Sequence, residues 1–294
     1  MTRAIEGHLI RGKGSAGSMC PLWVVSVLMA AMLSGGCDRH GQTTTDRPCI
    51  GVTTSYIECA VNDLTGGRMR IVRVMPPGGC PGHFDISPGT LGQLRDAAML
   101  FRFDFQSALD SKLERLRQGG LKIVPVPAGD GLCIPENYGD VCRVVCEALS
   151  ERWPSQAPDY RTALSKTQHR LEALGTRLRR EVAHAGLTGA KVLSSHHQAA
   201  FCQWLGLDVV GRITADQLTR LSSLSQNLTT GQWDRVRCVI ANRQEGDRPA
   251  RTLAERLHAR CVVFSNFPSM EPGQQTFDDL VRANLEALLK GDRP

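Results

Sequence analysis

Short apolar runs alternate with amphipathic stretches along most of this 294-residue chain, and this alternation constrains the fold more than any other feature. In the first half the runs fall at residues 49–55, 68–76, 99–105 and 122–127, and each is followed by a stretch of helical character. Strands and helices that alternate in this way form βα units around a parallel sheet. The sequence therefore predicts an α/β lobe over residues 49–157.

The same alternation returns in the second half of the chain. The apolar runs there are 191–195, 208–213, 237–243 and 261–268. Helical stretches separate them, and one helix is predicted at 214–228 with Thr214 as its N-cap. We expect these elements to form a second lobe with its own parallel sheet, over residues 187–294.

The segment between the two lobes, residues 158–186, carries no strand signal. Apolar side chains recur there at spacings of three, four or seven, namely Tyr160, Leu164, Leu171, Leu174, Leu178 and Val182. They form one stripe on a long helix whose other faces are polar. This helix is either one more surface helix or a rigid connector, and a connector gives an α/β fold of two βα lobes joined by one long helix.

The N-terminus has the order of an export signal. Basic residues precede the apolar run 21–33, which is too short for a permanent membrane span of about 20 residues, and small residues follow it. The stretch LSGGC resembles a bacterial lipobox, in which Cys37 would be lipidated and become the first mature residue. The alternative is a signal cut elsewhere, with Cys37 incidental. We expect residues 1–36 to be a lipoprotein signal peptide and 37–48 a polar tether, which holds an extracytoplasmic domain on the membrane.

Several function classes lack their sequence signatures. The net charge is +6, but no long basic run is interleaved with aromatic residues, so no nucleic-acid partner is expected. There is no G-x-S-x-G nucleophile elbow and no P-loop. We therefore expect a binding protein rather than an enzyme.

Polar and ionisable residues gather after the strands, where open α/β sheets bind their ligands. The residues that follow the predicted strands include Cys80, His83, Asp130, Cys133, Glu136, His196, His197, Asn266 and Glu271. If the two lobes face each other, these groups converge in one cleft. Imidazole together with carboxylate suits zinc or manganese, so the sequence predicts a divalent metal site.

The loop GCPGHFDISP, residues 79–88, places His83 among prolines and glycines that exclude a regular helix. This position favours a ligand over a core histidine. Cys80 in the same loop and Cys133 on a neighbouring loop either form a disulfide or supply a thiolate, since pairing needs a Cα separation below about 7 Å. A thiol redox site at Cys80 is less well supported, because the motif holds no second cysteine.

With these residues in place, the chain resembles the metal-binding lipoproteins of ABC importers for zinc and manganese. The resemblance runs from about Cys49 to Leu289 and is carried by four stretches: IGVTTSYIECAVNDLTGG, VRVMPPGGCPGHFDISPGTLGQLRDAAML, SSHHQAAFCQWLGL and SNFP with TFDDLVRANLEALL. It is also carried by the long helix between the lobes. The resemblance implies that one ion is held in the interlobe cleft by a residue from each of four loops.

The resemblance implies the first and third ligands directly. His83 matches the first. His197 matches the third by the Gln-Ala that follows it, whereas His196 matches by its distance from the strand.

The second and fourth ligand positions depart from the family pattern. Counting back from the proline of the second loop gives Asp130, and Glu136 follows that proline. Where the family has an aspartate after the last strand, this chain has Ser265 and Asn266. The site then uses Asp130, Glu136, Glu271 or a cysteine instead.

The resemblance implies an extracytoplasmic, lipid-anchored substrate-binding protein, on the periplasmic face where there are two membranes. It would capture Zn²⁺ or Mn²⁺ and deliver the ion to an ABC permease and its ATPase. The alternative is a structural or adhesive lipoprotein of the same fold, with an altered or lost metal site.

Overall fold

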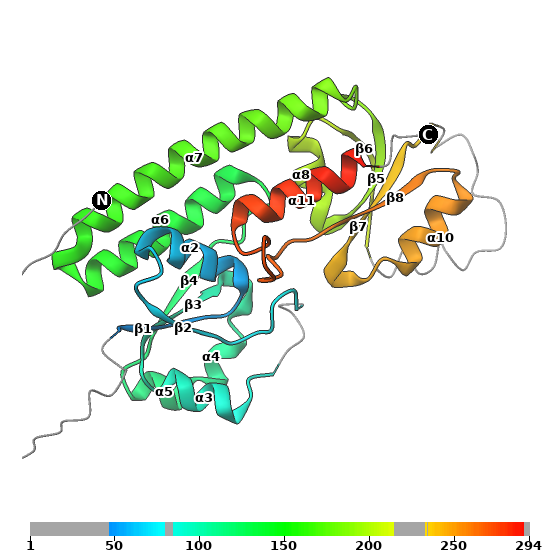
Figure 1. Ribbon diagram of the computed structural model, residues 1–294. Coiled ribbons are helices and arrows are strands. Elements are labelled where there is room, and N and C mark those ends of the chain that lie inside the picture. Colours follow the sequence, from blue (N-terminus) through cyan, green and yellow to red (C-terminus); the bar gives the residue numbers. More distant parts are fainter. Residues whose placement is uncertain (1–46, 80–84, 215–232, 234, 291–294) are drawn as a thin grey trace, which may run out of the picture. The chain divides into compact units, whose positions relative to one another are not determined.

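The computed structural model describes residues 47–79, 85–214, 233 and 235–290, and its elements alternate as the sequence predicts (Figure 1). Each of the eight apolar runs overlaps a strand. The predicted helix at 214–228 falls almost wholly outside the described residues. None of the helices in the described part of the chain has the length and apolar character needed to span a bilayer.

The first sheet has four parallel strands in the order β2-β1-β3-β4. Its strands are β1 (Cys49–Val52), β2 (Arg70–Arg73), β3 (Ala97–Phe103) and β4 (Lys122–Val126). The helices around it are α2 (Ser55–Thr65), α3 (Pro88–Leu94), α4 (Leu109–Lys112), α5 (Glu114–Gln118) and α6 (Pro135–Arg152).

Both faces of this sheet are buried. In β3, Met99 and Phe101 belong to the hydrophobic cluster that includes α2 and α6, whereas Leu100 packs with Leu94 of α3 on the other face. A sheet covered by helices on both faces needs apolar side chains at nearly every strand position. This explains why the strands read as continuous apolar runs rather than as alternating ones.

The second sheet repeats the arrangement with the strand order β6-β5-β7-β8, again all parallel. Its strands are β5 (Lys191–Ser195), β6 (Asp208–Ile213), β7 (Cys238–Asn242) and β8 (Arg260–Phe264). Its helices are α8 (His196–Trp204), α10 (Arg248–Arg256) and α11 (Phe277–Leu289), with a 3₁₀ turn, η3, at Arg243–Glu245. The fold is therefore α/β with two βα lobes, as predicted.

The long helix α7 (Ala157–His184) joins the two sheets in the chain and corresponds to the predicted helix at 158–186. Five residues of the predicted stripe are buried, namely Tyr160, Leu171, Leu174, Leu178 and Val182, and Leu164 is partly buried. A Cβ at Gly175 would lie 3.1 Å from the Trp204 indole of α8, so the small residue allows α7 and α8 to approach closely. Arg179, one turn further along α7, lies over the same indole at 4.6 Å.

One hydrophobic core is continuous between the two sheets. It includes Ile50 and Phe101 of the first sheet, Val192 and Ile240 of the second, and the buried stripe of α7. The connecting helix α7 is thus packed against both lobes.

Candidate functional site

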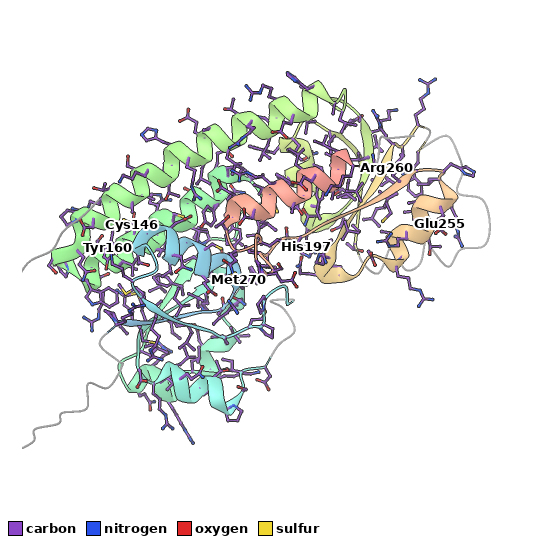
Figure 2. All side chains as sticks on the ribbon, in the orientation of Figure 1. Cys146, Tyr160, His197, Glu255, Arg260 and Met270 are labelled. Carbon is purple, nitrogen blue, oxygen red and sulfur yellow. The ribbon has the colours of Figure 1, made fainter. Side chains whose placement is uncertain are left out.

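A cavity of about 590 Å³ lies at the carboxyl edges of both sheets. The first lobe contributes Phe105 and the segment after β4, residues 128–132, and the second lobe contributes residues that follow β5, β7 and β8. In open α/β folds this edge is where ligands bind. Figure 2 labels His197, which lies at the carboxyl edge of the second sheet and lines this cavity.

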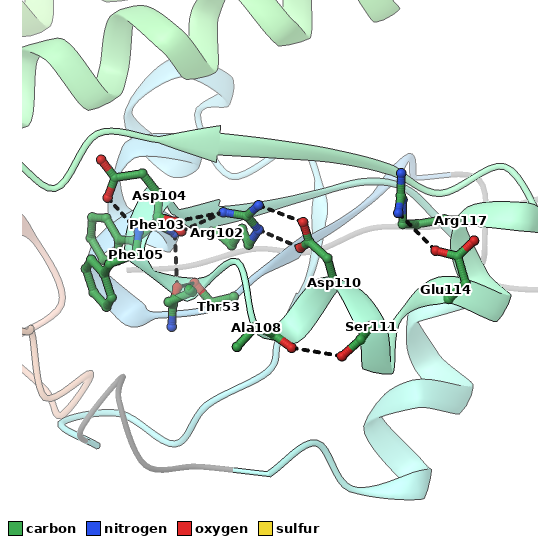
Figure 3. A network of polar contacts seen from close by, with 11 residues as sticks. Thr53, Arg102, Phe103, Asp104, Phe105, Ala108, Asp110, Ser111, Glu114 and Arg117 are labelled. Carbon is green, nitrogen blue, oxygen red and sulfur yellow. Dashed lines mark hydrogen bonds and ion pairs between the residues drawn. The ribbon is translucent and has the colours of Figure 1, made fainter.

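A partly buried ion pair fixes the end of β3 beside the cavity (Figure 3). The Arg102 guanidinium donates two hydrogen bonds of 2.7 Å to the carboxylate of Asp110. It also donates to the backbone carbonyls of Phe103 and Asp104, at 2.9 and 3.2 Å. Bidentate pairs of this kind are among the strongest polar contacts in proteins. They hold the turn that carries Phe105, an exposed aromatic ring stacked on Phe103, at the rim of the cavity.

The two predicted histidines lie at a topological switch point. In the second sheet, β6 lies on one side of β5 and β7 lies on the other. After β6 the chain crosses back past β5 to form β7, so the strand order changes direction between β5 and β7. Ligand crevices form at such points. His196 and His197 begin α8 directly after β5, and both line the cavity.

Glu245 stands across this switch point, in the turn η3 that follows β7. Its Oε1 lies 3.6 Å from His197 Nε2, and its Oε2 accepts a hydrogen bond of 2.8 Å from the hydroxyl of Ser195. We did not predict Glu245 as a site residue. The signal was present, because this carboxylate follows the apolar run 237–243 just as the histidines follow 191–195.

Behind the histidines lies a cluster of buried amides. The fully buried Gln198 donates through Nε2 to Asn266 Oδ1 at 2.9 Å and to Asn242 Oδ1 at 3.2 Å. Gln244 Oε1 accepts a hydrogen bond of 3.1 Å from the backbone N–H of Asn266. Asn266 lines the cavity, and its side-chain oxygen accepts the hydrogen bond from Gln198.

Cys133 is a buried thiol at the contact between the lobes. Its Sγ donates to the carbonyl of Ser265 at 3.1 Å and accepts from Asn284 Nδ2 at 3.3 Å. Burial raises the pKa of this thiol well above its usual range, so it is protonated at neutral pH. Cys133 is a free thiol in the structure, and Cys80, with which a disulfide was one of two alternatives, lies outside the described residues.

The other predicted donors fall in different places. Asp130 lines the cavity, and its backbone carbonyl accepts a hydrogen bond of 2.8 Å from Asn137. Glu136 lies in the first turn of α6 and lines a separate cavity. Its Oε1 is 3.9 Å from Nη1 of Arg179. Glu271 is exposed on the loop between β8 and α11.

His83 and Cys37 lie outside the described residues, so their predicted roles stay predictions. Within the described ranges, no group of three or more His, Cys, Asp or Glu side chains is arranged to hold a metal ion. The described site therefore offers a pair of donors, one imidazole nitrogen and one carboxylate oxygen, at the edge of a larger cavity.

Known proteins resemble this chain over nearly all of its described length. Residues 50–291 match the profile of the family described as ZnuA, the periplasmic component A of the zinc-uptake complex. No curated protein matches the chain.

Solved structures share its fold. The Mn-bound periplasmic metal-binding protein from Candidatus Liberibacter asiaticus superposes with a TM-score of 0.69 at 12% identity, over 83% of this chain and 99% of that one. A Cd-bound form of that protein gives the same TM-score at 13% identity, with the same coverage of both chains. A zinc-bound deletion mutant of ZnuA gives 0.67 at 16% identity, over 85% of this chain and 100% of the other.

Proposed function

The chain belongs to the ZnuA family of periplasmic zinc-uptake components, and on that premise we propose that it captures a divalent transition metal outside the cytoplasm and delivers it to an ABC permease. The captured ion is zinc or manganese. Hydrolysis of ATP belongs to a partner ATPase, because the chain itself has no P-loop. The protein acts by binding and release rather than by catalysis.

One observation carries this proposal: His196 and His197 follow β5 at the switch point of the second sheet and line a cavity that residues of both lobes share. Neutral imidazole is a good ligand for zinc and also suits other transition metals. His83, in the loop after β2, is proposed as the ligand that the first lobe supplies. The ion would then be held between the lobes.

The N-terminal segment supports a location outside the cytoplasm and an anchor in the membrane. The order of basic residues, apolar run and LSGGC is that of a lipoprotein signal, with Cys37 as the proposed site of lipidation. Residues 37–48 would act as the tether. A lipid anchor keeps the binding protein near the permease, which raises the local concentration of loaded protein at its partner.

Calorimetric titration of the mature protein with Zn²⁺ and with Mn²⁺ tests the proposal. We expect binding of at least one of the two ions at micromolar concentration or below. The double variant His196→Ala/His197→Ala should lose at least tenfold in affinity, whereas His184→Ala, at the far end of α7, should bind like the wild type. A wild-type protein that binds neither ion, or a double variant that binds as the wild type does, would contradict the proposal.

A second candidate is a structural or adhesive lipoprotein that keeps the fold without the transport. It is favoured by the amide at Asn266 and by the lack, among the described residues, of a group of three metal donors. Growth of a deletion strain in zinc-depleted or manganese-depleted medium separates the two candidates. A growth defect that added metal rescues supports transport, and unimpaired growth supports the structural role.

A further inference from the structure

We infer that Glu245 is a ligand of the captured ion and binds it together with His197; this inference rests on the proposed metal-binding function. Neither the predicted site residues nor the family resemblance included this carboxylate. Four observations on the second lobe lead to it.

The first observation is position. His197 follows β5 and Glu245 follows β7, and these two strands pair directly in the second sheet. The switch point of that sheet lies between the same two strands. The two side chains therefore flank the crevice in which an α/β sheet of this kind binds its ligand.

The second observation is distance. His197 Nε2 and Glu245 Oε1 are 3.6 Å apart, which is longer than a hydrogen bond between them would be. Two ligands of one tetrahedral zinc ion, each bonded at about 2.0–2.1 Å, are separated by about 3.4 Å. The two atoms are thus spaced as neighbouring ligands are, and a small rotation of either side chain closes the remaining gap.

The third observation is the way in which the carboxylate is held. Ser195 donates to Oε2 at 2.8 Å, which leaves Oε1 directed toward His197. The Glu245 side chain is 18% exposed, and no lysine or arginine of the described part of the chain forms an ion pair with it. Such a carboxylate is largely buried, has one oxygen held by a hydroxyl and forms no ion pair with a described lysine or arginine. Its second oxygen can therefore bind a metal cation. Hydrogen-bonded carboxylates of this kind are typical of metal ligands.

The fourth observation concerns the position where the family resemblance places its carboxylate ligand. Asn266 stands there after β8, and its Oδ1 accepts a hydrogen bond of 2.9 Å from the buried Gln198. The amide oxygen is therefore engaged within the protein and is not free to bind an ion. In this chain the carboxylate of the second lobe is supplied one strand away, after β7.

The test combines zinc affinity with direct observation of the bound ion. We would titrate the mature wild-type protein and the variants Glu245→Gln, Glu245→Asp and Glu255→Gln with Zn²⁺. Glu255 is the matched control, because it is an exposed glutamate of the second lobe, in α10, that does not line the cavity. Glu245→Gln keeps the size of the side chain and an acceptor for Ser195, so it removes the charge and leaves the fold intact.

We expect Glu245→Gln to lose about 100-fold or more in zinc affinity. Even residues that only hydrogen-bond to a metal ligand typically contribute about 10–100-fold to the affinity. Glu245→Asp should recover part of this loss, and Glu255→Gln should bind as the wild type does. A crystal structure of the zinc-loaded wild type should place the ion about 2.0–2.2 Å from a Glu245 oxygen.

A zinc ion bound more than about 3 Å from Glu245 would overturn the inference, as would a Glu245→Gln variant with wild-type affinity. These results leave the proposed function standing, because the wild type still binds metal. A wild-type protein that binds no metal overturns the proposed function and the inference with it.

Discussion

The phenol ring of Tyr138, in α6, stacks on the ring of Phe277 at the start of α11, with centroids 4.1 Å apart and planes 5° from parallel. Both side chains are fully buried. Tyr56 of α2 packs edge-on against each of these two rings. A helix that follows the second sheet in the chain thus completes an aromatic cluster of the first lobe.

Removal of the ring of Phe277 should therefore destabilise the whole protein. We expect Phe277→Ala to lower the free energy of unfolding by about 3–5 kcal/mol, the usual cost of replacing a buried Phe by Ala. Phe105→Ala, a change of the same kind at a ring that is 50% exposed, should cost less than about 1 kcal/mol. Chemical denaturation followed by circular dichroism measures both. A single transition is expected in each case, because one core joins the lobes; two separate transitions would show that the lobes unfold independently.

An ionic contact reinforces the same junction. Arg170 of α7 lies 2.6 Å from Asp63 of α2 and 2.8 Å from Asp278 of α11. Tyr138 donates to the same Asp63 carboxylate at 2.8 Å. Burial raises the pKa of Asp278, and Arg170 opposes that rise. The positive charge of Arg170 thus compensates the negative charges of two carboxylates that belong to different lobes.

Arg170→Met should leave both carboxylates without their closest cation. We expect a loss of roughly 1–3 kcal/mol in the free energy of unfolding, less than for a fully buried pair because the Arg170 side chain is 33% exposed. Arg282→Met is the matched control, since Arg282 reaches Asp278 only at 3.4 Å and is 45% exposed. Equal losses in the two variants would contradict the special role of Arg170.

The two neighbouring histidines should contribute unequally to metal affinity. His197 faces Glu245 across the switch point, whereas no such carboxylate contact of His196 is present among the described residues. We expect His197→Ala to weaken zinc binding at least tenfold more than His196→Ala does. Competition with a chromophoric chelator measures both affinities, and the reverse ranking would assign the ligand to His196.

Alkaline pH should destabilise the protein through its buried thiols. Burial raises the pKa of Cys202 to about 12, against about 8.5 for a free cysteine. The unfolded chain therefore loses this proton first as pH rises. The stabilising contribution is complete below about pH 8.5 and declines between that value and about 12, by up to about 1.4 kcal/mol per pH unit.

Guanidinium unfolding of the wild type and of Cys202→Ala, at pH 8 and at pH 10.5, checks this prediction. The free energy of unfolding should fall less steeply with pH in the variant, whatever its stability at pH 8. Parallel pH dependences would show that Cys202 ionises in the folded protein as it does in the unfolded chain.

The fold could be predicted from the sequence because the local signals agree with the tertiary structure. The predicted helix at 158–186 corresponds to Ala157–His184, and each apolar run overlaps a strand of a parallel sheet. These signals depend only on which residues neighbour one another in the chain, and that is what periodicity reports.

The site was only partly predictable, because its residues meet through the order of the strands. His196, His197 and Asp130 lie at the cavity where the strand-end rule placed them. Glu245 follows its strand as the histidines follow theirs, but its contact with His197 could not be predicted, because it requires β5 and β7 to be neighbours and strand order cannot be read from local pattern. Glu136 follows the correct strand, but it lies in the first turn of α6 and is directed toward Arg179 and another cavity.

The stacking of Phe277 on Tyr138 also affects the order in which the chain can fold. Because α11 follows every other element described here, the aromatic cluster of the first lobe lacks the ring of Phe277 until this helix has been synthesised. Contacts between residues so far apart in sequence form slowly. The first lobe should therefore not complete its packing until α11 has been synthesised, which suits a protein proposed to act outside the cytoplasm.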